Sequence, residues 1–269
     1  MLKKWGFLVV LIAVISASCS KYQQLLKSSD MELKYEAAMA YYEDEKYERA
    51  MALFEELIPL FRGTDRSEEV YYSYCYCNYQ LGMLYSAAYH FKKFSVTYPL
   101  SEHAQETLFM FAYSNYLLSP IPTLDETETK DGVNALQLFI NTYPQNELVD
   151  SSNVLMDKLR GKLEVKSYLN AKQYHKIYKF KSAIIAINNT LLDFPETEYR
   201  EELTFLILKS HFLLAENSVK KKKQERINET IDAYYIFADA YKESKYLKEA
   251  QNIFTKVSKL RDDYKTKNS

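Results

Sequence analysis

A short segment that recurs along the chain constrains the possible fold more than any other feature of the sequence. Three copies end in an aromatic residue followed by proline, at Tyr98-Pro99, Tyr143-Pro144 and Phe194-Pro195. The aligned copies occupy residues 87–99, 132–144, 183–195 and 230–242, with a degenerate fifth copy at 50–62. Self-similarity at such intervals is typical of repeat proteins, in which each unit packs against its neighbours.

Each copy has the pattern of an amphipathic helix. A small residue is followed by further core-type residues four and seven positions later, and residues at these offsets share one helix face. The triplets are Ala50, Phe54, Leu57; Ala87, Phe91, Phe94; Gly132, Leu136, Phe139; Ala183, Ile187, Thr190; and Thr230, Tyr234, Phe237. A proline at the end of a copy is expected to stop the helix, because it has no N–H donor and its ring clashes with the preceding turn.

The residues ahead of the first copy indicate which kind of repeat this is. Ala37, Ala38, Tyr41 and Tyr47 complete a pattern that resembles the tetratricopeptide repeat, a pair of antiparallel helices. The ends of successive copies lie 37 to 51 residues apart, more than the roughly 34 of the plain repeat, so we expect inserted sequence. The predicted fold class is all-α, a right-handed solenoid of about five tetratricopeptide-like helix pairs.

Composition and charge exclude several classes of protein. The chain of 269 residues has 5 glycines, all isolated, whereas a dinucleotide fold or a phosphate loop needs several glycines in one turn. The formal net charge is −1, far from the basic excess that nucleic-acid binding requires. We therefore expect neither a nucleotide enzyme nor a nucleic-acid partner.

The N-terminus has the pattern of a secretion signal. Lys3 and Lys4 precede an apolar run, and small residues then lead into Cys19. This order resembles a bacterial lipobox, which implies a signal peptide of residues 1–18 and lipidation of Cys19. An ordinary signal peptide with an incidental cysteine is the alternative. Because Ser20 and not Asp follows the cysteine, resemblance to the enterobacterial sorting rule favours the outer membrane.

The rest of the chain is predicted to form one continuous domain. A lipidated tether is expected at residues 19–30, the repeat domain at 31–262 and a disordered tail at 263–269. Residues 119–131 contain two prolines and are predicted to be an inserted loop between the helices of the third pair. The lysine run at 220–223 is expected in a polar loop of the fifth pair, either simply solvated or docking an acidic partner.

No pattern in the sequence points to catalysis. The histidines His90, His103, His175 and His211 are dispersed and form no helical zinc motif, and no nucleophile elbow is present. Cys75 and Cys77 are two residues apart on a predicted helix, pointing in different directions, so we expect two buried thiols and no disulfide. We predict no enzyme activity, no cofactor and no metal site.

The combination of lipobox and repeats resembles the BamD family of outer-membrane lipoproteins, which belong to the β-barrel assembly machinery, in a Bacteroidetes-like form. The similarity covers nearly all of the chain after the signal. It is carried by the start at residues 19–30, the three aromatic-proline stops, the Leu159-Arg160-x-Lys162-Leu163-Glu164 segment and the Leu124-Asp125-Glu126-Thr127 loop. Glu126 departs from the glutamine expected at its position.

The resemblance implies a non-enzymatic adaptor on the periplasmic face of the outer membrane. Its N-terminal helix pairs would receive segments of unfolded barrel substrates, and its C-terminal pairs would dock the central barrel-assembly protein through a POTRA domain, beside other assembly lipoproteins. By this analogy the candidate residues of the substrate-peptide groove are Tyr41, Tyr42, Tyr72 and Tyr79. The candidate docking residues are Arg160, Lys162, Tyr199 and Arg200.

Two other interpretations remain open at this point. A repeat lipoprotein that recruits peptidoglycan hydrolases would copurify with wall enzymes. A glycan-binding lipoprotein of the SusD kind is a further alternative, but sugar platforms usually stack on tryptophan. The only tryptophan, Trp5, lies within the predicted signal.

Overall fold

The computed structural model describes residues 21–268, and all regular structure in that range is helical. Residues 21–27 form a short helix, followed by α2 (Met31–Glu43), α3 (Tyr47–Leu60), α4 (Ser67–Gln80), α5 (Leu84–Thr97), α6 (Ala104–Leu118), α7 (Thr127–Thr142), α8 (Val149–Lys176), α9 (Phe180–Asp193), α10 (Arg200–Glu216), α11 (Lys220–Ala240) and α12 (Leu247–Asn268). The prediction of an all-α chain is confirmed. The signal peptide of residues 1–18 and Cys19 lie outside the described residues.

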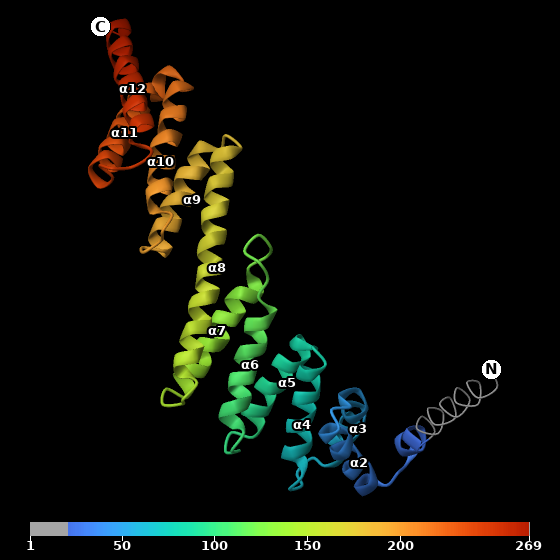
Figure 1. Cartoon of the computed structure of the whole chain (residues 1–269). Helices are drawn as coiled ribbons and strands as arrows, with labels where there is room; N and C mark the ends of the chain where they lie inside the picture. Colours follow the sequence, from blue (N-terminus) through green and yellow to red (C-terminus); the bar gives the residue numbers. More distant parts are fainter. Residues whose placement is uncertain (1–20, 269) are drawn as a thin grey trace, which may run out of the picture. The chain divides into compact units, whose positions relative to one another are not determined.

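The helices follow one another as five pairs, from α2/α3 to α10/α11, with α12 as a final single helix (Figure 1). Helices adjacent in sequence pack against each other from α2 to α7 and from α9 to α12. Helices α5, α7 and α9 end two residues before Pro99, Pro144 and Pro195, as expected for a proline stop. Local sequence therefore sets where the second helix of these pairs ends.

The repeated triplets form the interior of the pairs. All of their members are buried except Tyr234, which is half-buried. The small residue of the third triplet permits a close approach, because a Cβ on Gly132 would lie 2.7 Å from Leu159 Cδ1 and 3.3 Å from the Asn115 carbonyl oxygen. Cys75 and Cys77 are buried free thiols, as predicted.

The described chain divides into two compact units. Unit 1 contains the described residues up to Ser119 together with Thr127–Leu159, and unit 2 contains Pro120–Glu126 and the residues from Arg160 onward. The core of unit 1 includes Phe54, Phe91 and Phe139, and the core of unit 2 includes Leu208 and Phe237. The predicted domain boundaries stay predictions.

Three segments differ from the expectations. The lysine run at 220–223 is the first turn of α11 and not a loop, since lysine is a good helix former and Lys223 Nζ donates to the Glu216 carbonyl oxygen at 3.0 Å. The loop of the third pair, expected over 119–131, ends at Glu126, and α7 begins at Thr127. The tail expected to be disordered is helical as far as Asn268.

Candidate functional site

The first helix of each pair contributes an aromatic ring to a contact with the next pair, which we call a junction cluster. In unit 1, the Arg66 guanidinium carbon lies 4.5 Å from the centre of the Tyr35 ring. The Tyr35 hydroxyl donates to the Glu69 carboxylate. Arg66 is the residue before α4 and Glu69 lies in its first turn, so the start of α4 holds the tyrosine of α2 by its face and by its hydroxyl.

The second junction cluster repeats this geometry between α4 and α6. His103, the residue before α6, stacks on Tyr72 with ring centres 4.1 Å apart, and the Tyr72 hydroxyl donates to Glu106 Oε2 at 2.9 Å. Tyr76 donates to the other oxygen of Glu106. Burial first, and then the bond to Glu106, raises the pKa of Tyr72 above its ordinary value. Burial is also the first cause that raises the pKa of Tyr76, so both hydroxyls remain donors well above neutral pH.

Unit 2 contains the same arrangement with lysine added. Tyr199 stacks on Tyr168 at 4.0 Å, and the Tyr168 hydroxyl donates to Glu202 Oε2 at 2.7 Å. Lys172 Nζ lies 2.8 Å from Glu202 Oε1 and donates to the Tyr168 hydroxyl oxygen at 2.7 Å. The hydrogen bond to Glu202 is the largest of the effects that raise the pKa of Lys172.

In the last junction cluster of unit 2, Phe205 stands where the other clusters have tyrosine. Tyr246 stacks on Phe205 at 4.7 Å, and Lys209 Nζ lies 2.8 Å from Glu249 Oε1. The junction between α6 and α8 has no tyrosine and no acid at these positions: Phe109 and Leu148 share one hydrophobic cluster, and Ser151 is the residue three positions after Leu148. Four of the five junctions within residues 21–268 thus combine an aromatic contact with a charged group, and in the fifth the ring packs in a hydrophobic cluster.

The structure places the predicted groove tyrosines together in one hydrophobic cluster of unit 1. Tyr41, Tyr42, Tyr72 and Tyr79 are all half-buried there. Burial first raises the pKa of Tyr42, to about 12. Tyr72 is held by its junction cluster and Tyr79 lies edge-on to Phe91 at 6.4 Å. Tyr41 contacts Tyr22 at 5.6 Å. Much of each ring is therefore used in packing within the unit.

The predicted docking residues lie on two helices of unit 2. Arg160 and Lys162 are on α8, with Arg160 exposed and Lys162 half-buried, and burial lowers the pKa of Lys162. Tyr199 and Arg200 are at the start of α10. Arg200 Nε donates to the Pro195 carbonyl oxygen at 3.1 Å, so its guanidinium covers the end of α9.

A hollow between α9, α10 and α11 was not foreseen from the sequence. It has a volume of about 460 Å³, and Arg200 and Ile236 are among its lining residues. A second hollow of about 240 Å³ shares His211 and Glu229 with it. His211 Nδ1 is 3.4 Å from Glu229 Oε2 without hydrogen-bond geometry, and burial lowers the pKa of this histidine. The sequence offered one signal, the aliphatic Ile236 beside the fifth triplet, and the structure shows that this side chain is exposed.

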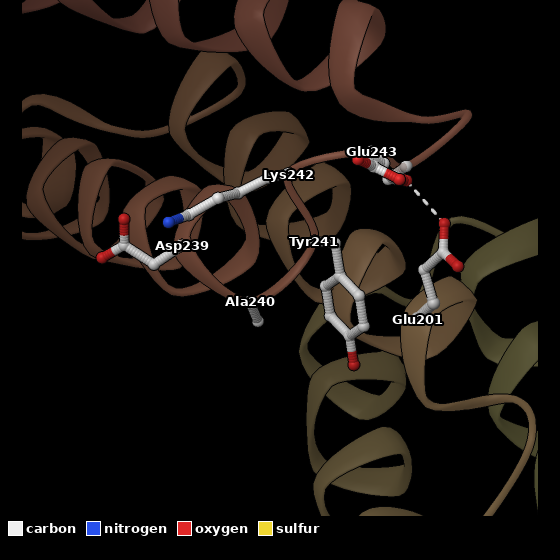
Figure 2. Close-up of a pocket in the computed structure, with 7 residues that line it drawn as sticks. Glu201, Asp239, Ala240, Tyr241, Lys242 and Glu243 are labelled. Carbon is white, nitrogen blue, oxygen red and sulfur yellow. Dashed lines mark hydrogen bonds between the residues drawn. The ribbon is translucent and has the colours of Figure 1, made fainter.

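A more polar hollow of about 450 Å³ surrounds the turn between α11 and α12 (Figure 2). Its labelled side chains come from this turn, the end of α11 and, for Glu201, the first turn of α10. Ser244 Oγ donates to Glu201 Oε1 at 2.6 Å, and Ser101 donates in the same way to Glu68 in unit 1. Because the bond recurs in both units, we interpret this turn as part of the repeat.

No group of three or more His, Cys, Asp and Glu side chains within residues 21–268 is arranged to hold a metal ion. Among the helices of that same range, none combines the length and apolarity needed to span a bilayer.

Comparison with known families decides the identity of this arrangement. A family model described as an outer membrane lipoprotein, YfiO, matches residues 27–227. The chain belongs to this family. The resemblance to BamD-type outer membrane lipoproteins of the assembly machinery is thereby confirmed. The match covers all five helix pairs except most of α11.

Other comparisons are more distant. No curated protein gives a significant match. Two crystal structures of nearly identical tetratricopeptide-like repeats from Podosopora anserina, named for a kinesin light chain, are 13% and 12% identical to this YfiO-family chain. Their TM-scores are 0.31 and 0.32, and the alignments cover 89% and 90% of this chain and 97% and 100% of theirs.

Proposed function

We propose that this YfiO-family protein is a lipid-anchored, non-enzymatic scaffold of β-barrel assembly on the periplasmic face of the outer membrane. The observation that carries the proposal is the family match over residues 27–227. The sequence before that range supports an anchor, since basic residues, an apolar run and small residues lead to Cys19. Several acyl chains on this cysteine would hold the protein stably at the membrane, where one chain would bind only marginally.

The first helix pairs are proposed to receive segments of unfolded barrel proteins. Tyr42, Tyr72 and Tyr79 support this role, because they are half-buried rings from neighbouring first helices in one cluster. A tyrosine offers apolar area and a hydroxyl at a low cost in conformational entropy. Since the Tyr72 hydroxyl is already bonded to Glu106, its ring and not its hydroxyl would make the contact.

The last helix pairs are proposed to dock the central barrel-assembly protein through its POTRA domain. The hollow beside Arg200 supports this role, because it combines a cation with the exposed aliphatic side chain of Ile236. Interfaces of this kind usually have an apolar centre and a polar rim. Arg160 adds an exposed cation on α8 of the same unit.

Crosslinking and affinity purification from outer membranes test the proposal. We expect the central barrel-assembly protein to copurify with the intact chain, and Cys19→Ala to release the chain from membranes after a salt wash. Recovery of peptidoglycan hydrolases without a barrel-assembly protein would favour the adaptor alternative. If Cys19→Ala stayed bound to the membrane, the lipid anchor would be wrong.

A matched pair of variants tests the docking surface. Ile236→Asp places a charge in the hollow, whereas Leu192→Asp changes another exposed aliphatic residue that lines neither of the two hollows around His211. We expect Ile236→Asp to reduce recovery of the barrel-assembly protein and Leu192→Asp to leave it near the level of the parent chain. Equal recovery with both variants would exclude this hollow as the docking surface.

A further inference from the structure

The described part of the predicted tether, from residue 21 onward, packs against the first helix pair. Residues 21–27 are helical, and Tyr22, Leu25 and Leu26 contact the hydrophobic cluster of unit 1. These three residues lie at i, i+3 and i+4, so they share one face of the short helix. All three are half-buried. Residues 21–27 are therefore packed on unit 1.

Tyr22 occupies a site made by two residues of that helix pair. Its ring meets the edge of Tyr41 with centres 5.6 Å apart at 85°. The Arg49 guanidinium carbon lies 5.3 Å from the centre of the Tyr22 ring and 5.6 Å from that of Tyr41. The Tyr22 hydroxyl donates to the Arg49 carbonyl oxygen at 3.2 Å. An aromatic edge, a cation on the ring and an acceptor for the hydroxyl together select a tyrosine-like side chain.

A buried lysine, Lys34, completes the site that binds the short helix; we call Tyr41, Arg49 and Lys34 the seat. Lys34 is only 7% exposed. Its Nζ donates to the Leu26 carbonyl oxygen at 2.9 Å and to the Glu56 carboxylate. An ammonium at the end of a helix interacts favourably with the helix dipole and with the carbonyls that have no partner inside the helix. The seat thus recognises both an aromatic side chain and the end of a short helical turn.

We propose that Tyr41, Arg49 and Lys34 form a peptide-binding site, which Tyr22 and residues 21–27 occupy in cis and from which an amphipathic segment of another chain can displace them. The ligand would carry an aromatic residue followed three and four positions later by aliphatic residues. This inference rests on the proposed peptide-receiving role of the first helix pairs. The segment's own chemistry identifies the class of ligand.

Residues 21–27 have the properties of a bound segment that a ligand from another chain can displace from the site. A seven-residue helix is marginal on its own, so its bound state depends on the contacts described above. Its effective concentration is high, because Asp30, three residues after Lys27, already caps α2. A ligand in trans must therefore bind through the same groups or be present at high concentration. The cis segment would accordingly exclude weak ligands and admit strong ones.

A tryptophan reporter tests the site in the full-length protein. Trp5 is the only tryptophan, so Trp5→Phe with Tyr22→Trp leaves one reporter whether or not the signal is removed. The probes are a synthetic peptide of residues 21–29 and the same peptide with Tyr22→Ala. We expect emission typical of a shielded indole, and a shift to the emission of exposed indole when the tyrosine peptide is added. The alanine peptide should need about tenfold higher concentration.

Variants in the seat provide the control. Arg49→Gln should shift the reporter toward exposed emission without any peptide, whereas Glu48→Gln, an exposed neighbour, should not. Exposed emission from the Tyr22→Trp reporter before any peptide is added would show that residues 21–27 do not occupy the site. Shielded emission that no peptide changes would show that these residues cannot be displaced from it. Either result overturns the proposal. Because no barrel substrate is used, failure here is distinguishable from failure of the assembly role, which copurification measures.

Discussion

One junction of unit 2 has the same residue spacing as two junctions of unit 1 but different chemistry. In Tyr35/Glu69, Tyr72/Glu106 and Tyr168/Glu202, 34 residues separate the ring from the acid, and the stacking partner is three residues before the acid. In unit 1 the neutral hydroxyl of Tyr76 donates a hydrogen bond to the second carboxylate oxygen of Glu106. In unit 2 the ammonium of Lys172 occupies the equivalent place.

This difference indicates that the two units respond to different conditions. Hydroxyl donors lose their function when tyrosine ionises, so the contacts of unit 1 should fail in alkali. Ammonium–carboxylate contacts weaken in salt and when the carboxylate is protonated. The bonds from Lys172 and Tyr168, against the effect of burial, lower the pKa of Glu202. A repeat spacing is thus maintained by two kinds of donor with opposite sensitivities.

The largest expected effect is alkaline unfolding of unit 1. Burial is the largest effect on most tyrosines of unit 1 whose pKa is raised. It raises the pKa of Tyr35 and of Tyr42 to about 12. The pKa is raised in unit 1 for Tyr22, Tyr35, Tyr42, Tyr71, Tyr72, Tyr74, Tyr76, Tyr79 and Tyr85, and in unit 2 for Tyr168 and Tyr199. The unfolded chain releases these protons from about pH 10, so stability present below that pH is lost as the pH rises toward the folded values.

Single reporters in each unit measure this difference. In the Trp5→Phe background, Phe111→Trp reports on unit 1 and Phe254→Trp on unit 2, and both positions are half-buried. We expect the emission of the Phe111→Trp variant to change at a lower alkaline pH than that of the Phe254→Trp variant. Coincident transitions would contradict the comparison.

Removal of the shared acceptor in unit 1 is the next largest effect. Glu106→Ala leaves the hydroxyls of Tyr72 and Tyr76 without their charged acceptor, which costs about 2–3 kcal/mol of unfolding free energy. Glu102→Ala is the matched control, because its side chain is 86% exposed. Denaturant melts at neutral pH measure both variants. A Glu106→Ala loss no larger than that of Glu102→Ala would show that the hydroxyl bonds do not stabilise the junction.

The second helices were predictable from the sequence because their signals are local. The triplets and the prolines lie within one segment, and helix period and proline chemistry suffice to interpret them. The family was also predictable, since Cys19 and the repeats occur together. The prediction of a loop at 220–223 is wrong because polarity alone does not indicate a loop, and lysine, although polar, favours helices.

The junction clusters were not predicted, because each joins residues more than thirty positions apart. A signal for them existed in the constant spacing of Tyr35/Glu69, Tyr72/Glu106 and Tyr168/Glu202, which insertions elsewhere do not change. The seat of Tyr22 had no such signal. It depends on which surface of the first helix pair is left uncovered, and that follows only from the packed structure.

Alanine substitutions at one glycine of each unit compare how closely the two units are packed, with a smaller expected effect on stability. In Gly132→Ala the new Cβ would lie 2.7 Å from Leu159 Cδ1, and overpacking of this kind costs about 1–3 kcal/mol. The higher helix propensity of alanine offsets at most about 1 kcal/mol. In Gly161→Ala, on α8, the Cβ meets nothing within 4 Å, so the same propensity should stabilise the chain by up to about 1 kcal/mol. Thermal melts should therefore shift in opposite directions, and shifts of the same sign would contradict the close packing at Gly132.

The smallest expected effect concerns the ion pairs of unit 2. Lys209→Met keeps the apolar stem over Phe205 and removes an ammonium whose pair with Glu249 is exposed, with side chains 37% and 50% accessible. Such pairs contribute about 0.2–1 kcal/mol and less in high salt. Lys172→Met should cost more, because Lys172 also bonds the Tyr168 hydroxyl and Glu202 is only 28% accessible. Because the pKa of Glu202 is lowered, its contribution is present above the ordinary carboxyl pKa and is lost as the pH falls through the folded value. Thermal melts at low and high salt measure both variants. At neutral pH the melting temperature of Lys172→Met should lie below that of Lys209→Met, and in acid the two melting temperatures should converge. A difference that persists in acid would show that Lys172 acts through packing and not through its charge.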